Sequence, residues 1–303
     1  MPMQQNHGIH MEELYCFYDP IVKSYATAFS CKIIPQKAIR EHLFNVDMLR
    51  SIQELITFAE HTEDNFLASF IYRLIGVREI IFCRENKIDL AINLVWIFIA
   101  KSIRIIPTEF TISSIGSQGF LSIPLYKEDK SLEKFDFIRL HIWDDSLNEF
   151  MDLKKCEDFS IHSHTFFAKS WIITGKVINN RFEYDTKTSD ETHSFFEVQY
   201  DKSLNEVNQH SSKAVKTNVN VRLSKISEEI YFSKGYYEIQ PSKLHQSGHL
   251  NSPYPSATFF SFTGKDGLGD SFVVGPTEIN QSEINRKMNI SPIYLLDKIE
   301  SQL

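Results

Sequence analysis

The sequence predicts an α+β protein with an N-terminal helical bundle, then an all-β barrel or sandwich, and a C-terminal helix. Three observations indicate this fold class. From residue 35 to residue 106, apolar residues recur at the spacing of buried helix faces. After Ile106 the chain changes to short apolar runs separated by turn residues, which is typical of strands. Close to the C-terminus, Ser291 and Pro292 form a helix-start signal ahead of a buried face made by Ile293, Leu296 and Ile299.

Length and composition fit a two-domain globular protein. A chain of 303 residues is long enough for two domains, and the change of periodicity places their boundary near residue 110. We expect a helical domain over 1–110 and a barrel domain over 111–303. The 24 Phe and 12 Tyr residues predict an aromatic-rich core. A formal net charge of −7 without a Lys/Arg cluster argues against nucleic acid as a partner, because phosphate binding needs clustered cations.

Neither a disulfide framework nor a membrane segment is predicted. The four cysteines are widely spaced and form no C-x-x-C pair, so reduced thiols in a cytoplasmic protein are expected. The first residues lack the basic and apolar regions of a secretory signal. The most apolar run, 94–100, is too short to cross a bilayer and is predicted to be a buried helix.

Three helices are expected in the first domain. The first carries an apolar stripe made by Leu43, Met48, Ile52, Leu55, Ile56 and Ala59. Asp64 is a candidate N-cap for the second helix, whose apolar residues run from Phe66 to Ile75. The third begins near Asp89 and is apolar nearly all round, as expected of a central helix in a small bundle.

Nine short strands without interspersed helices are expected in the second domain, which favours a sandwich or barrel. They span residues 119–125, 135–143, 170–174, 176–184, 195–200, 218–224, 236–239, 257–262 and 271–274. The polar stretches 186–192 and 203–218 are predicted to be loops. The glycine-rich segment 264–269 lacks the following helix of a phosphate loop and is predicted to be a β-turn.

The segment with the most chemical content contains His162-Ser-His164. On a strand, residues two apart point to the same face, so both imidazoles can reach one point inside a barrel. Neutral imidazole suits iron, zinc, copper or nickel. By itself, an H-x-H pair also fits two ordinary hydrogen-bonded histidines.

The surrounding spacing resembles the first metal motif of the cupin superfamily. That motif runs Gly, five residues, His-x-His, three residues, Glu, six residues, Gly. Here the first glycine position holds Cys156, the glutamate position holds Ala168, and the last glycine is Gly175. The resemblance implies a double-stranded β-helix barrel over about residues 115–280, with His162 and His164 as metal ligands.

A second stretch resembles the other cupin metal motif. Gly235 and Pro241 have its Gly-five residues-Pro spacing, and His245 follows one residue earlier than usual. The resemblance implies that His245 is the third ligand. His249, four residues later, is the alternative third ligand if the register differs.

Ala168 in place of the motif glutamate implies a site of three neutral histidines. Among cupins, that arrangement is similar to the thiol dioxygenases, such as cysteine dioxygenase, and it implies Fe(II) as the cofactor. Their substrate-clamping arginine has no counterpart in the stretch 121–124, and their later His and Tyr appear here as Phe260 and Phe262. The layout of the metal site is therefore similar, whereas a thiol substrate is not implied.

The resulting hypothesis is an iron-dependent dioxygenase, an oxidoreductase acting on a small organic substrate. The candidate substrate-binding residues are Arg139, His141, Arg181, Tyr236 and His249; no catalytic residue is assigned. The alternative hypothesis is a cupin module that binds or senses a small ligand without turning it over. A cupin isomerase or lyase with another divalent metal is a third. The helical domain is expected to cover the barrel mouth or to form a homodimer surface.

Overall fold

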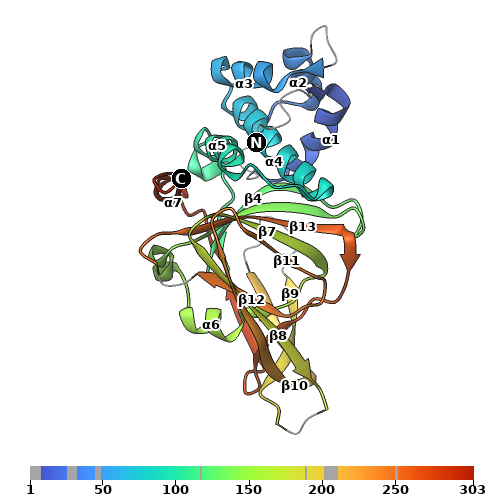
Figure 1. The fold of residues 1–303 in the computed structure, drawn as a ribbon, viewed down its shortest axis with the longest axis vertical. Coiled ribbons are helices and arrows are strands. Elements are labelled where there is room, and N and C mark those ends of the chain that lie inside the picture. Colours follow the sequence, from blue (N-terminus) through green and yellow to red (C-terminus); the bar gives the residue numbers. More distant parts are fainter. Residues whose placement is uncertain are drawn as a thin grey trace. The chain divides into compact units, whose positions relative to one another are not determined.

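A computed structural model describes residues 8–25, 33–44, 49–116, 118–187, 190–200, 211–249 and 252–303 (Figure 1). The chain divides into two compact units. Unit 1 comprises Met1–Ile112 with Pro124–Glu128, and unit 2 comprises Ser113–Ile123 with Asp129–Leu303. Helices dominate the first unit and antiparallel sheets the second, so the predicted α+β class is confirmed.

Unit 1 is built from helices and one small sheet. The helices are α1 (Met11–Val22), α2 (Gln36–Leu43), α3 (Ile52–His61), α4 (Asn65–Asn86) and α5 (Ile92–Arg104). The short strands β1 (Ile9–His10) and β2 (Leu49–Arg50) pair with each other. The 3₁₀ turn η2 (Thr108–Phe110) follows α5.

Local sequence explains where these helices begin. Asp64 accepts a hydrogen bond from the backbone N–H of Leu67, as its predicted role as an N-cap requires. Ser51 and Glu54 form a reciprocal capping box that starts α3. The single first helix that we predicted is therefore two helices, because its apolar stripe is divided between α2 and α3 with β2 between them. Met48 of that stripe lies outside the described residues. The helix α5 begins at Ile92, three residues after the predicted start.

Unit 2 contains two seven-stranded antiparallel sheets. Sheet I has the order β15-β10-β8-β12-β6-β14-β9, with a further pairing between β10 and β9. Its strands are β6 (Ile161–His162), β8 (Lys176–Asp185), β9 (His193–Tyr200), β10 (Ser211–Phe232), β12 (His245–His249), β14 (Val273–Pro276) and β15 (Gln281–Asn285). Sheet II has the order β11-β7-β13-β5-β4-β3-β16. Its strands are β3 (Ser114–Ile115), β4 (Leu121–Glu128), β5 (Asp136–Trp143), β7 (Phe166–Thr174), β11 (Tyr236–Ile239), β13 (Ser256–Leu268) and β16 (Lys287–Met288).

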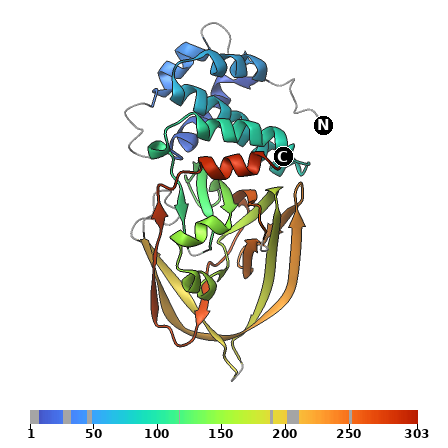
Figure 2. The same cartoon turned by 90° about the vertical axis from the view of Figure 1, so that its left-hand side faces the viewer.

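Two predicted loops are strands. The 22-residue strand β10 includes residues 211–218, which were predicted to be loop; residues 201–210 lie outside the described residues (Figure 1, Figure 2). β10 pairs with β8, β9 and β15. These backbone hydrogen bonds explain why the segment is a strand although many of its side chains are hydrophilic. The predicted turn at 264–269 also lies largely within β13, where Gly267 takes the positive φ of +124°.

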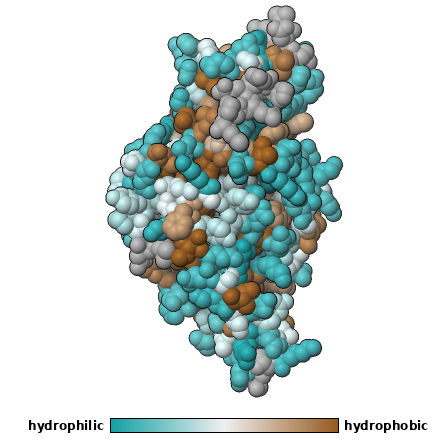
Figure 3. Space-filling model, viewed as in Figure 1, coloured by the Kyte–Doolittle hydropathy of each residue, from teal (hydrophilic) through white to brown (hydrophobic). Residues whose placement is uncertain are grey.

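The two sheets face each other across an apolar cluster. Sheet II contributes Trp143, Ala168, Ile172, Tyr237, Ile239 and Phe260, and sheet I contributes Val177, with Tyr231 packed against it. The shorter helices of unit 2 are α6 (Leu153–Asp158) and α7 (Ile293–Glu300); Pro292, rather than Ser291, occupies the N-cap position of α7. On the surface drawn in Figure 3, apolar side chains of unit 2 stand among polar ones. Within the described ranges, every helix is too short or too polar to cross a membrane.

Candidate metal centre

His162 and His245 are brought together by the register of two short strands of sheet I. β6 and β12 are antiparallel neighbours, and their paired position sets His245 opposite His162. Residues that face each other across such a pair point to the same side of the sheet. Their imidazole ring centroids are 4.5 Å apart.

His164 joins this pair from the link between the two sheets. β6 ends at His162, and the next strand, β7, belongs to sheet II. The His164 ring centroid lies 4.7 Å from those of His162 and His245. One nitrogen from each ring lies within 4.8 Å of the other two, and bonds of about 2.1 Å to one ion would draw them closer. The three predicted ligands thus form one cluster, although His162 and His164 do not share a strand as expected.

Hydrogen bonds hold the link that carries His164. The Ser163 hydroxyl donates to the carbonyl oxygen of Asp270 at 3.1 Å and accepts from the backbone N–H of Phe272 at 2.9 Å. The backbone N–H of Ser242 donates to the His164 carbonyl oxygen at 3.0 Å. The second motif is therefore bonded to the first just before it reaches its own histidine.

Gly175, the last glycine of the first motif, is required by backbone geometry. It makes the turn between β7 and β8 with a φ of +78°, in the left-handed region that favours glycine. A Cβ atom at this position would collide with Ser256. The turn places β7 and β8 in different sheets, on the two sides of the histidine cluster.

Each of the three rings has a nitrogen that is available to a metal ion. His162 Nδ1 lies 2.7 Å from the Ser160 carbonyl oxygen, which fixes it as the donor and leaves Nε2 as the ligand atom. His164 Nε2 and His245 Nδ1 are buried and have no hydrogen-bond partner among the described residues. Buried polar nitrogens without partners are costly unless something binds them. The three residues therefore fit a bound divalent metal ion.

Burial also keeps the three rings neutral. Loss of solvation lowers the pKa of His162, and it holds the pKa values of His164 and His245 well below the ordinary value of 6.5. The neighbouring His162 is the second-largest cause that lowers the pKa of His164 and of His245. Neutral imidazole is the form that ligates metal ions, so the cluster is ready for a cation at neutral pH.

The ligand set contains no carboxylate. Among the described residues, the cluster of metal-ligating side chains consists of the three histidines alone. Ala168 occupies a fully buried position in β7 between Ile239 of β11 and Phe262 of β13. The Phe262 ring centroid is 4.7 Å from that of His164 and the Phe260 centroid 6.0 Å, so aromatic side chains line this side of the cluster.

Arg181 lies beside the cluster but its charge is already balanced. It stands opposite His245 in the pairing of β8 with β12. Its Nε donates to Glu229 Oε2 at 3.0 Å, and its Nη2 donates to the Glu238 carbonyl oxygen at 2.7 Å. The guanidinium group of Arg181, a candidate substrate-binding residue, is therefore already paired with an internal carboxylate.

Glu229 is the centre of a polar network that the sequence did not reveal. Burial by itself would raise the pKa of its carboxyl, but hydrogen bonds from Asn179, Tyr231 and Arg181 hold the pKa below its usual value. The side-chain oxygen of Asn179 also accepts a hydrogen bond from the Ser247 hydroxyl at 3.3 Å. Strand register alone could have suggested this network, because Asn179 and Glu229 are paired across β8 and β10.

The candidate Tyr236 lies on the surface, whereas its neighbour Tyr237 is buried. Tyr236 is 47% exposed, and its ring packs against the Lys169 ammonium group at 4.0 Å. Its neighbour Tyr237 is buried in the cluster between the sheets, and its hydroxyl lies 3.2 Å from Ser247 Oγ. Of the two tyrosines, Tyr237 is the one that packs between the sheets.

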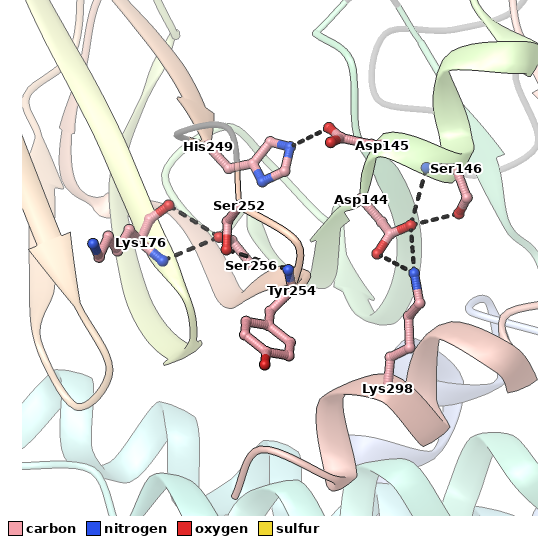
Figure 4. Close-up of polar contacts among 9 residues, drawn as sticks. All are labelled: Asp144, Asp145, Ser146, Lys176, His249, Ser252, Tyr254, Ser256 and Lys298. Atoms are coloured by element: carbon pink, nitrogen blue, oxygen red, sulfur yellow. Dashed lines mark hydrogen bonds and ion pairs between the residues drawn. The ribbon is translucent and has the colours of Figure 1, made fainter.

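His249 lies outside the three-histidine cluster. It is on the same strand as His245, and its Nε2 is 3.4 Å from Asp145 Oδ1 (Figure 4). The adjacent Asp144 is bound by Lys298 of α7 at 2.8 Å in the same region. Of the two alternatives for the third ligand, His245 lies in the cluster with His162 and His164, and His249 does not.

The remaining candidates, Arg139 and His141, lie on β5 of sheet II. The His141 ring stacks between those of Phe120 and Phe260, at 4.1 and 4.9 Å. Burial, followed by the charge of Arg139, holds the pKa of His141 well below 6.5. The charge of Arg139 is also among the smaller causes that lower the pKa of His164, after burial and the neighbouring histidines.

Comparisons with known proteins were made for sequence and for structure. No family model and no curated protein sequence matches the chain. Solved structures that align with it include a cupin-like protein from Thermotoga maritima, 12% identical, covering 55% of this chain and 83% of its own, with a TM-score of 0.25. Another is the hydroxypropylphosphonic acid epoxidase from S. wedmorenis, 9% identical, covering 80% and 99%, with a TM-score of 0.26. Likenesses at these TM-scores do not establish a shared fold.

The neutral histidines predict a specific pH dependence of stability. A histidine whose pKa is lower in the folded than in the unfolded state binds fewer protons when folded, so the free energy of unfolding falls as pH drops below about 6.5. The limiting slope is about 1.4 kcal/mol per pH unit for each such histidine. We expect the metal-free protein to unfold at a lower urea concentration at about pH 5.5 than at about pH 7.5, and His245→Ala to reduce the difference. Equal midpoints at the two pH values would contradict the neutral, buried state of these rings.

Proposed function

We propose that the chain is a cupin-type metalloprotein that binds iron(II) through His162, His164 and His245 and acts as an oxygenase on a small organic substrate. The main support is the ligand set: three neutral histidines, of which His245 is buried and His162 and His164 are partly buried, converge with no carboxylate among the described residues of the cluster. The motif spacing and the position of the cluster between two facing antiparallel sheets support the assignment to the cupin superfamily.

The ligand set determines which chemistry an ion would supply. With three neutral ligands, a bound divalent ion keeps its full charge and has positions left for exogenous ligands, so it can act as a Lewis acid towards a small molecule. Ser160 fixes the orientation of the His162 ring through its carbonyl oxygen. Phe260 and Phe262 exclude water from the His164 side.

A non-catalytic binding or sensing module is the second candidate, and a specific observation favours it. The two positions that correspond to a His and a Tyr in thiol dioxygenases are Phe260 and Phe262, and both rings lie against His164. Neither can transfer a proton. Catalysis would therefore need another group that transfers protons. Neutral His141 is available for this role, because only the Phe260 ring separates it from His164.

The experiment combines metal content, nitric oxide binding and oxygen uptake. Protein loaded anaerobically with iron(II) is expected to hold about one ion per chain, since the three histidines form one site. Nitric oxide should then give the EPR signal of a high-spin iron nitrosyl, because three protein ligands leave open positions. Oxygen uptake with a panel of small carboxylic acids and thiols tests turnover. Iron and nitrosyl without uptake for any compound would favour the binding module, and iron that fails to bind would contradict the proposal.

A further inference from the structure

We propose that the inner face of sheet II beside the histidine cluster binds the acidic group of a small organic acid, with Trp143, Thr258 and His141 as hydrogen-bonding residues and Arg139 as the opposite charge. This inference deepens the proposed function and rests on it, because the acid is the molecule held beside the metal. It assigns a substrate class to a site whose substrate the sequence leaves open.

Three polar groups on the β5 and β13 part of this face are buried without a partner among the described residues. Trp143 Nε1, Thr258 Oγ1 and His141 Nε2 are without a hydrogen bond to any described residue. The three side chains are 3%, 0% and 5% exposed, so solvent does not reach them freely. Native proteins rarely bury such groups unpaired, and their concentration on one face indicates a ligand that completes their hydrogen bonds.

The strand register shows that these groups form a single site. Thr258 of β13 stands opposite His141 of β5, and Trp143 lies two residues further along the same face of β5. The centroids of the His141 and Trp143 rings are 6.1 Å apart. The Phe260 ring contacts both His141, at 4.9 Å, and the metal ligand His164, at 6.0 Å. The polar groups are therefore one aromatic ring away from the histidine cluster.

Charge identifies the ligand as an anion. A divalent ion on three neutral histidines retains its whole charge, and Arg139 adds a further positive charge on the face of His141. The carboxylate of Glu229 is already paired with Arg181. Because the indole N–H of Trp143 can only donate, the matching ligand atom is an acceptor oxygen. A carboxylate supplies that oxygen together with the negative charge.

The other side chains around the proposed acid site favour a ligand whose remaining part is short and apolar. Phe120, Ile172, Val177, Phe260 and Phe262 belong to or pack against the cluster between the two sheets. These side chains offer no polar group to a ligand, and the Tyr237 hydroxyl in the same cluster is hydrogen-bonded to Ser247. A monocarboxylic acid with a small hydrocarbon chain fits both parts of the lining.

The test uses the full chain loaded with zinc, which is diamagnetic, and butanoate as the probe, with butanamide as its neutral analogue. The chain has three tryptophans, so each indole N–H resonance can be assigned by a single Trp→Phe variant. We expect butanoate to shift the Trp143 indole resonance and to bind at least about tenfold more tightly than butanamide, as loss of a charge-assisted hydrogen bond implies. Trp143→Phe and the nearly isosteric Thr258→Val should each weaken butanoate binding several-fold.

A matched control is available on the opposite face of the same sheet. Trp171 of β7 is also buried, but it stands beside the exposed Tyr236 and near Lys169. Trp171→Phe makes the same chemical change and should leave butanoate binding unaltered. Thr258→Val should not lower the thermal midpoint of the zinc-loaded protein, because it replaces an unpaired hydroxyl by a methyl group.

The outcomes separate this inference from the proposed function. Zinc content measured on every sample tests the metal site independently of butanoate. If zinc is bound but butanoate binding is absent, equals that of butanamide, or is unchanged in both Trp143→Phe and Thr258→Val, the acid site is overturned and the metal site stands. If zinc is not held while butanoate binding still depends on Trp143, the acid site stands and the proposed metal function fails.

Discussion

Replacing His245 by alanine is expected to abolish tight metal binding while leaving the fold intact. The variant leaves two protein ligands, and the loss should exceed the roughly 100-fold that removal of a second-shell partner can cause. Because His245 Nδ1 is a buried atom without a partner, its removal should not destabilise the metal-free protein strongly. Competition with a chelator measures the affinity, and circular dichroism checks the fold.

His249→Ala is the matched control for that experiment. It removes the same side chain from the same strand, but its imidazole contacts Asp145 rather than the cluster. We expect its metal affinity to lie within a few-fold of the wild-type value, since only a 3.4 Å contact with an exposed carboxylate is lost. If His249→Ala loses the metal and His245→Ala keeps it, the third ligand is assigned wrongly.

Ala168→Glu is expected to make stability depend on metal. In the metal-free protein, the new carboxylate lies at a fully buried position among apolar residues. An uncompensated buried charge should lower the free energy of unfolding by about 3–5 kcal/mol. A divalent ion on the adjacent histidines offers the missing opposite charge, so metal should restore much of that loss. Because a fourth, anionic ligand takes a position that small molecules need, nitric oxide binding to the iron(II) form should decrease.

Ala168→Gln separates charge from size. Glutamine has nearly the same volume as glutamate but no charge, so it should lower stability about equally with and without metal. Thermal unfolding of both variants, with and without one equivalent of metal, provides the comparison. If glutamate and glutamine respond identically to metal, residue 168 does not face the ion and the cupin register of the first motif is wrong.

Much of the architecture could be predicted from local patterns. Asp64 is followed by apolar residues at helical spacing, and it caps α4 as that pattern indicates. The strands that begin near residues 135, 176 and 236 were predicted within one residue of their observed starts. The convergence of the histidines could be predicted only from motif spacing, because hydrophobic periodicity does not show which strands become neighbours.

The errors have identifiable physical causes. β10 was partly missed because its polar residues imitate a loop, whereas pairing on both edges determines its structure. Which of Tyr236 and Tyr237 is buried could not be predicted, because alternation along a strand does not show which of its two faces is buried. The Glu229 network was missed because Asn179, Arg181 and Glu229 come from two strands about 50 residues apart, and only the register of β8 with β10 joins them.

The most direct test of the metal centre is anomalous diffraction from crystals of the protein loaded with iron(II). The account predicts one strong peak about 2.0–2.2 Å from a ring nitrogen of each of His162, His164 and His245, as expected for metal–imidazole bonds. It also predicts no carboxylate oxygen at bonding distance, because Ala168 stands where the standard cupin ligand would be. A peak that lies elsewhere, or the absence of any peak in iron-loaded crystals, would contradict the central claim.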